Sequence, residues 1–252
     1  MEAGQLDMRT CLALALCLLL SASSLSALAD RPDLPDPHAP APPPAQAKPR
    51  GRLFAAQDLG LLEAPDRDQW QKPEQIMDTL GIADGSVVAD LGAAGGWFTL
   101  QLARRVGPNG LVYAEDIQPQ MIEAIGRRMQ NENRQNVTPV LGTPSDPRLP
   151  AGLDAVIISD AYHEMDDPAD RTLVVTLLTN VARSLKPQGR LGIVDYTAGG
   201  GGPGPSADQR VDPEAVIAAA RAAGLELIKR EDFPPFVFLL VFGRAPSGRG
   251  SP

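Results

Sequence analysis

The residues best suited to chemistry form a short polar cluster, residues 159–164, directly after a run of apolar residues. Within it, His163 carries an imidazole that is neutral near pH 7 and could take a proton from an oxygen or nitrogen nucleophile. Glu164 could orient that imidazole. We therefore take His163, Tyr162 and Asp160 as candidate catalytic residues. In the structural alternative, His163 packs beside Tyr162 and Glu164 caps the next helix.

A second group of candidates is the glycine-rich turn at residues 90–96 (DLGAAGG), which links an apolar run to a predicted helix. Its glycines let the backbone pass close to a ligand. A further apolar run, residues 111–117, carries the acidic pair Glu115-Asp116 near its end. A carboxylate at this place can accept hydrogen bonds from both hydroxyls of a ribose. Strand, glycine turn, helix, strand and acid together form the layout of a nucleotide-binding βαβ unit.

Two classes of ligand use this layout. Dinucleotide sites have the pattern G-x-G-x-x-G, which fails here because Ala94 follows Gly92 where the second glycine should be. Residues 90–96 instead resemble D-x-G-x-G-x-G, the first motif of the class I S-adenosylmethionine-dependent methyltransferases. Asp90, Gly92 and Gly96 match that motif. Ala94 departs from it by one methyl group near the expected position of the cofactor.

Two further segments resemble the same family. Residues 113–122 (YAEDIQPQMI) resemble the version V-Y-A-x-D-I-Q-P-x-M-I of small-molecule and uncharacterised members. Residues 183–191 (RSLKPQGRL) resemble the common segment L-K-P-G-G-x-L. The resemblance covers roughly residues 70–243. It implies an α/β fold with three layers, Rossmann-like, in which a seven-stranded sheet is mostly parallel and its last strand is antiparallel.

The apolar pattern and the turn signals predict alternating strands and helices. Residues 198–206 are glycine and proline-rich, and we interpret them as a mobile loop over the site, with a plain surface loop as an equal alternative. Pro234-Pro235 is the expected bend between the last two strands. The expected strands cover residues 87–91, 111–117, 137–141, 153–160, 190–196, 225–230 and 236–242, and the expected helices cover 70–80, 96–106, 119–128, 173–185 and 212–223.

The resemblance implies that residues at the carboxyl ends of the strands hold S-adenosylmethionine. Asp116, rather than Glu115, stands where the family carries its ribose-binding acid. Asp146 either contacts the adenine amine or forms the turn before Pro147. Asp160 would border the sulfonium. The implied cofactor contacts are Asp90, Gly92, Ala93, Gly96, Asp116, Ile117, Asp146 and Ser159.

Composition narrows the chemistry further. Both cysteines, Cys11 and Cys17, lie near the N-terminus, so the rest of the chain has no thiol for catalysis or metal binding. We expect no metal, because Tyr196 stands where metal-dependent O-methyltransferases carry a further Asn.

A net charge of −8 disfavours nucleic acid as a partner. No Asn-Pro-Pro-Tyr-like segment follows residues 153–160, so a small molecule is the expected acceptor.

The N-terminus predicts a destination outside the cytoplasm. An uncharged apolar run is followed by Ala27-Leu28-Ala29, the small-residue signature of a cleavage site before Asp30. An uncleaved membrane anchor is the alternative, in which the membrane contacts only this segment. We expect export, to the periplasm. The expected organisation is a leader at 1–29, a Pro-rich linker at 30–50, a methyltransferase-like domain at 51–243 and a disordered tail at 244–252.

The sequence therefore predicts an S-adenosylmethionine-dependent methyltransferase acting on an unidentified, small acceptor. A second class stays open, an exported domain of the same fold that binds without catalysis, because the cofactor is made in the cytoplasm. An NAD-dependent oxidoreductase is the third class, and the broken G-x-G-x-x-G pattern disfavours it.

Overall fold

The computed structural model describes residues 53–199, 201–233 and 236–246. The predicted leader and linker, the Pro234-Pro235 bend and the end of the predicted tail fall outside these ranges. Within them, no helix combines the length and the apolar character needed to cross a bilayer.

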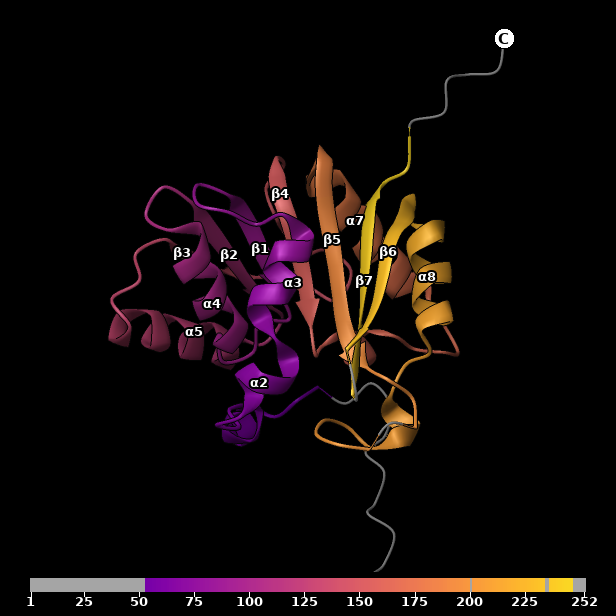
Figure 1. The fold of residues 1–252 in the computed structure, drawn as a ribbon, viewed down its shortest axis with the longest axis horizontal. Coiled ribbons are helices and arrows are strands. Elements are labelled where there is room, and N and C mark those ends of the chain that lie inside the picture. The colour runs from indigo at the N-terminus through magenta and orange to yellow at the C-terminus, as the bar shows by residue number, and fades with distance from the viewer. Residues whose placement is uncertain (1–52, 200, 234–235, 247–252) are drawn as a thin grey trace, which may run out of the picture. The chain divides into compact units, whose positions relative to one another are not determined.

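A seven-stranded sheet with the order β3-β2-β1-β4-β5-β7-β6 forms the centre of the described chain (Figure 1). The pairs from β3 through β5 are parallel, and β7 runs antiparallel to both β5 and β6. The predicted fold, including its antiparallel last strand, is confirmed. The strands are β1 (Val87–Leu91), β2 (Leu111–Asp116), β3 (Val137–Leu141), β4 (Leu153–Ser159), β5 (Leu185–Tyr196), β6 (Leu225–Phe233) and β7 (Val237–Arg244).

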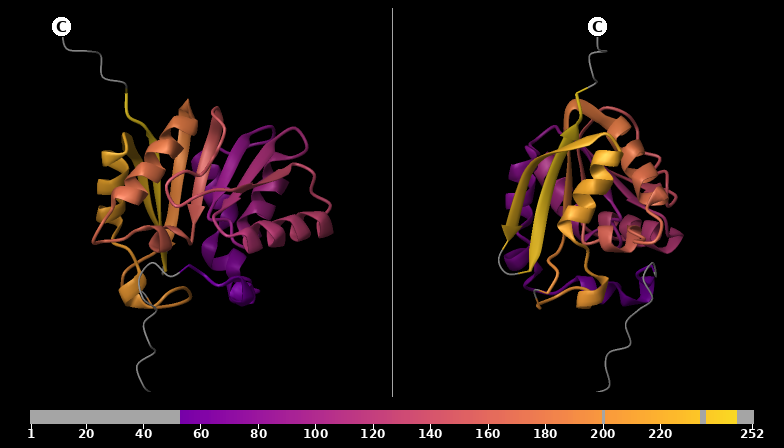
Figure 2. Two further views of the ribbon diagram at one scale, coloured as in Figure 1. Left: turned by 180° about the vertical axis from the view of Figure 1, so that it is seen from behind. Right: turned by 90° about the vertical axis from the view of Figure 1, so that its right-hand side faces the viewer.

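Helices cover both faces of the sheet, which gives the three layers (Figure 2). Alternation along β4 shows how the faces are divided: Val156 and Ile158 pack toward α7 and α8, whereas Ala155 and Ile157 pack toward α3 and α4. Because both faces are covered, the central strands are apolar on both sides. The helices are α3 (Pro73–Leu80), α4 (Trp97–Val106), α5 (Pro119–Asn131), α7 (Thr172–Ser184) and α8 (Pro213–Ala222).

Two predicted boundaries are wrong for local reasons. The helix predicted over 70–80 is two helices, α2 (Arg67–Gln71) and α3, separated by Lys72, which has a left-handed backbone with φ of 50°. Residues before a proline avoid the helical region, and Pro73 follows directly. Strand β5 begins at Leu185 rather than Arg190, where its pairing with β4 shifts register.

Segments that precede β1 and segments that follow β4 and β5 lie together at one edge of the sheet. Figure 1 shows α2 and the loop after β5 at the end toward which β4 and β5 point. The 3₁₀ helices η1 (Ala56–Leu62) and η2 (Ala207–Gln209) and the one-turn helix α6 (Tyr162–Met165) belong to the segments that connect here. Ligands bind at this carboxyl edge in open α/β sheets.

Candidate cofactor and catalytic site

A small hollow of about 30 Å³, partly open to solvent, lies against the glycine turn after β1. It brings together residues from the carboxyl ends of β1 and β4, which are neighbours in the sheet. Leu59, Leu62 and Glu63, from η1 and the residue after it, line it as well. The predicted site residues that line it are Asp90, Gly92, Ala93, Ser159 and Asp160.

The glycine turn has the tight geometry that a close approach of backbone and ligand needs. Gly92 has φ of 74°, and a Cβ there would lie 2.7 Å from the Cβ of Ala161. Gly96, with φ of 78°, is the residue from which α4 begins. Ala94 also has a left-handed backbone, with φ of 47°. The alanine that departs from the motif therefore occupies a conformation in which glycine costs less.

Asp116 ties the end of β2 to this turn. Its Oδ2 accepts a hydrogen bond from the Ala94 amide at 3.0 Å, and its Oδ1 accepts one from the Gln118 amide at 2.9 Å. The carboxylate is thus fixed beside the glycine turn, where the ribose-binding acid was predicted. Ile117 follows it, half-buried.

Two further acids are buried beside Asp116. Burial raises the pKa of Asp90 to about 6, although the Thr99 hydroxyl donates to its Oδ2 at 2.6 Å. Burial and the neighbouring Asp116 raise the pKa of Glu115 to about 8. Glu115 Oε1 has no hydrogen-bond partner in the described chain, and a Cβ on Gly142 would lie 1.8 Å from it. Glu115 is therefore a neutral acid near pH 7, enclosed by a glycine.

Asp146 lies on the surface and organises a turn. Its Oδ1 accepts from the Arg148 amide at 2.9 Å, and its own amide donates to the Thr143 hydroxyl at 3.0 Å. In this structure the contacts of Asp146 are therefore those of a turn-forming residue. Contact with adenine stays a prediction.

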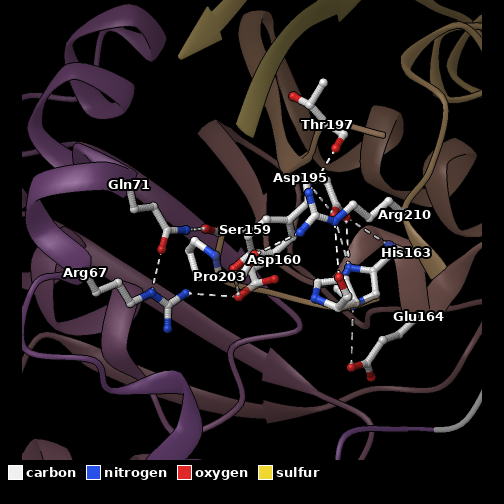
Figure 3. A network of polar contacts seen from close by, with 12 residues as sticks. Arg67, Gln71, Ser159, Asp160, His163, Glu164, Asp195, Thr197, Pro203 and Arg210 are labelled. Atoms are coloured by element: carbon white, nitrogen blue, oxygen red, sulfur yellow. Dashed lines mark hydrogen bonds and ion pairs between the residues drawn. The ribbon is translucent and has the colours of Figure 1, made fainter. Parts of the chain in front are cut away.

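Arg67 is a buried cation that the sequence analysis did not identify. Its guanidinium lies 4.2 Å from the centre of the Trp97 ring and 3.5 Å from Asp160 Oδ2. It also donates to Gln71 Oε1, and the Gln71 amide in turn donates to Ser159 Oγ at 2.6 Å (Figure 3). The spacing of four residues between Arg67 and Gln71 on α2 was the only local signal for this pair.

His163 makes its closest contacts with Asp195 at the end of β5. The Nδ1 atom lies 3.1 and 3.2 Å from the two carboxylate oxygens, and the His163 amide donates to Oδ2 at 2.9 Å. Burial opposes a charge on the imidazole, but Asp195, with Asp160 and Glu164, outweighs it and raises the pKa of His163 to about 9. These carboxylates therefore favour the charged imidazole, against the expectation of a neutral one near pH 7.

Tyr162 does not share the site with His163. Its side chain is 0% exposed and packs in the core with Val174 and Leu178 of α7. Its hydroxyl has no partner among the described residues, and burial raises its pKa. Consecutive residues of the single turn α6 point in different directions, which is why Tyr162 enters the core while His163 turns to Asp195. This placement in the core does not support Tyr162 as a catalytic residue.

Asp160 joins the two halves of the site. In Figure 3 it lies between Arg67 and His163. The Tyr196 hydroxyl donates to its Oδ2 at 3.0 Å, and burial raises its pKa to about 6. The Tyr196 ring also lies edge-on to the His163 ring, with 6.4 Å between centres. Asp160 itself has φ of 58°, a left-handed backbone at the end of β4.

Arg210 organises the loop after β5. Its guanidinium lies 5.3 Å from the centre of the Tyr196 ring. It donates to the carbonyls of Thr197, Gly201, Pro203 and Pro205 at 2.9–3.1 Å. A Cβ on Gly204 would lie 2.4 Å from the Tyr196 ring. The glycine-rich loop therefore packs on the site through one arginine and one tyrosine.

Comparison with known proteins agrees with this geometry. Residues 88–189 match the family model described as "Methyltransferase domain". The matched segment runs from β1 into β5. A segment of 120 residues is 30% identical to a fibrillarin-like rRNA/tRNA 2'-O-methyltransferase of Pyrobaculum aerophilum, and 121 residues are 29% identical to a nocamycin O-methyltransferase of Saccharothrix syringae.

These matches cover 45% and 47% of the chain, and the chain spans about half the length or less of the curated relatives it matches, 46% and 41%. Among solved structures, the methyltransferase domain is similar to an S-adenosylmethionine-dependent methyltransferase of Aquifex aeolicus, with a TM-score of 0.69 and 22% identity over 75% of this chain and 98% of that one. A glycopeptide N-methyltransferase complexed with sinefungin has a TM-score of 0.56 and 15% identity over 69% of this chain and 86% of that one.

Replacing Ala94 with glycine should relieve the strained turn. The left-handed backbone costs a non-glycine residue about 1–2 kcal/mol. The greater freedom of glycine in the unfolded chain reduces the gain from its introduction by about 0.4–1 kcal/mol. We expect Ala94→Gly to raise the free energy of unfolding in urea by up to about 1 kcal/mol. Ala103→Gly, within α4, is the control and should lower it by about 1 kcal/mol or more. A loss of stability in Ala94→Gly would contradict the strain.

Glu115 should make the methyltransferase domain less stable at high pH. Because the pKa of Glu115 is raised from 4.5 to about 8, the folded state keeps a proton that the unfolded chain releases above pH 4.5. The stability from this group is present at low pH and is lost as the pH rises toward 8. Glu115→Gln cannot ionise, so it should gain about 1–3 kcal/mol over the wild type at pH 9.

Urea unfolding at pH 5, 7 and 9 measures this effect, and the difference between variant and wild type should grow with pH. Glu226→Gln, at an exposed position on β6, is the control. A difference that is constant across the three pH values would show that Glu115 does not titrate as its burial requires.

Proposed function

We propose that the methyltransferase domain binds S-adenosylmethionine and transfers its methyl group to a small acceptor. The observation that carries the proposal is that one edge of the sheet holds both Asp116, fixed at the glycine turn, and the His163–Asp195 pair. The small hollow beside the glycine turn supports a ligand at this edge of the sheet, and Gly92 itself has no room for a side chain.

The chain's own residues would hold the cofactor as follows. Asp116 would accept hydrogen bonds from the ribose hydroxyls. The backbone from Gly92 to Gly96 and the cation of Arg67 would face the methionine portion, since an arginine can hold a carboxylate through two parallel hydrogen bonds. Ser159 and Asp160 would border the sulfur. The bound cofactor supplies an activated methyl group, so the residues mainly align the acceptor and exclude water.

A small molecule is the acceptor that the charge of the chain supports. The net charge of −8 opposes a nucleic acid backbone, which is bound through exposed lysines and arginines. Arg210 is occupied by hydrogen bonds to loop carbonyls. The similar proteins divide on this point, because one is named for nocamycin and another for rRNA and tRNA. Methylation of RNA is therefore the second candidate function, and an acceptor assay with RNA would test it.

The N-terminus bears on where this reaction takes place. We propose that residues 1–29 direct export and are cleaved before Asp30, with an uncleaved anchor as the alternative. If export separates the domain from its cofactor, the non-catalytic binding module becomes the better description. N-terminal sequencing of the protein from its native cell tests this proposal. A mature chain that begins at Asp30 supports export, and an intact leader in the membrane fraction contradicts it.

Cofactor binding is tested with the purified protein by calorimetry. Wild type should bind S-adenosylmethionine and its demethylated product, and Asp116→Asn should weaken binding by about 1–3 kcal/mol through the lost charged hydrogen bonds. Asp232→Asn, an exposed acid on β6, is the matched control and should leave the affinity unchanged. Absence of both heat and thermal shift with millimolar ligand would refute the proposed function, and binding of NAD instead would favour an oxidoreductase.

A further inference from the structure

We propose that residues 53–71 form a gate, which occupies the place of the cofactor in the unliganded protein and has to swing away before the cofactor can enter. The gate consists of the residues before η1, of η1 itself and of α2. The inference rests on the proposed function and adds to it the step that admits the ligand and sets its rate of entry.

The hollow beside the glycine turn is too small for the cofactor in this state of the protein. Its volume of about 30 Å³ has room for about two water molecules, whereas pockets for small-molecule ligands measure about 300 Å³ or more. The ends of β1 and β4 line it, and so does Phe98, which belongs to the core. The gate lines it with Leu59, Leu62, Glu63 and Arg67. Room for the ligand therefore has to come from the gate.

Leu59 lies directly on the glycine turn. A Cβ on Gly95 would lie 3.1 Å from Leu59 Cδ2 and 3.7 Å from Glu63 Oε1. The backbone from Gly92 to Gly96 is the part of the turn that the proposed function assigns to the methionine portion of the cofactor. Leu59 thus covers the surface that the ligand needs, so the two compete for one place.

The first half of the gate has little support from the core. No residue of η1 is buried, whereas α3, which follows the gate, buries Ile76, Met77 and Leu80. Segments with few buried apolar contacts open at a low cost in free energy. Lys72, with its left-handed backbone, separates the gate from α3. We therefore place the hinge at Lys72.

Polar contacts hold the first half of the gate closed. The Phe54 amide donates to Glu164 Oε2 at 2.9 Å, and the side-chain amide of Gln118 donates to the Phe54 carbonyl at 3.0 Å. Further along, Glu63 forms an ion pair with Arg128 of α5, and both side chains are partly exposed. An ion pair of this kind contributes little, so this part of the gate can be released without disturbing the core.

The second half of the gate is held by groups that the ligand would also contact. Arg67 lies 3.5 Å from Asp160 Oδ2, and the Gln71 amide donates to the Ser159 hydroxyl at 2.6 Å (Figure 3). The proposed function assigns Ser159 and Asp160 to the sulfur of the cofactor and Arg67 to its carboxylate. The incoming ligand would therefore replace the contacts that keep the gate closed.

Both tryptophans of the chain report on this movement. Trp70 belongs to α2, and its ring lies 6.1 Å from that of Tyr196, whereas Trp97 lies 4.2 Å from the guanidinium of Arg67. Stopped-flow fluorescence of the full chain mixed with S-adenosylhomocysteine should follow the gate directly. Because the gate opens before the ligand binds, the observed rate should level off at high ligand concentration.

Loss of the Glu63–Arg128 ion pair should raise the rate at which this plateau is reached. Glu63→Gln and Arg128→Gln should each raise the plateau about two- to fivefold, as expected for one partly exposed ion pair. The double variant should raise it no further, because both changes remove the same contact. Glu132→Gln removes the exposed ion pair with Arg104 and is the matched control, which should leave the plateau unchanged.

Hydrogen exchange of the wild type is a second measurement that needs no variant. Binding of S-adenosylhomocysteine should speed exchange over residues 56–63, which leave the site, and slow it over residues 90–96. A rate that rises in proportion to ligand concentration without a plateau, or slower exchange over residues 56–63 in the complex, overturns the inference alone. If the ligand binds neither the wild type nor the gate variants, the proposed function fails and the inference fails with it.

Discussion

Burial of carboxyl groups at one edge of the sheet is the constraint on which the site depends. Asp90, Glu115, Asp116 and Asp195 are all at most 6% exposed, and the side chain of Asp160 is 11% exposed. Burying a charge is costly unless it is paired or hydrogen-bonded. Three of these acids meet this cost in different ways. Glu115 is neutral near pH 7, Asp116 accepts two backbone hydrogen bonds, and Asp195 holds His163.

The sheet itself explains why the acids gather. Its central strands are covered by helices on both faces, so β1 and β4 are apolar for most of their length. Polar side chains can enter only where a parallel strand ends, and all parallel strands end at the same edge. The left-handed backbones of Gly92, Ala94 and Asp160 lie there too, since the chain must turn sharply out of the sheet. The fold thus concentrates both buried acids and left-handed backbones at the carboxyl edge, where open α/β sheets generally bind ligands.

The sequence predicted the parts of the site that depend on neighbouring residues. The glycine turn and Asp116 follow from local patterns, and the structure contains both. The mostly parallel sheet with an antiparallel last strand followed from the family resemblance, and the structure contains it as well. Contacts between distant residues could not be predicted, and these include Arg67 with Asp160 and His163 with Asp195. One turn of helix has no periodicity from which a direction could be inferred, so the sequence could not show that Tyr162 enters the core while His163 contacts Asp195.

The loop after β5 shows how such distant contacts change the interpretation of function. Its glycines suggested a mobile cover, yet Arg210 holds four of its carbonyls and lies over Tyr196. Tyr196 is hydrogen-bonded to Asp160, which in turn pairs with Arg67 beneath η1 and α2. Arg67, which lines the hollow, and the His163–Asp195 pair are therefore joined by a continuous set of polar contacts through Asp160 and Tyr196.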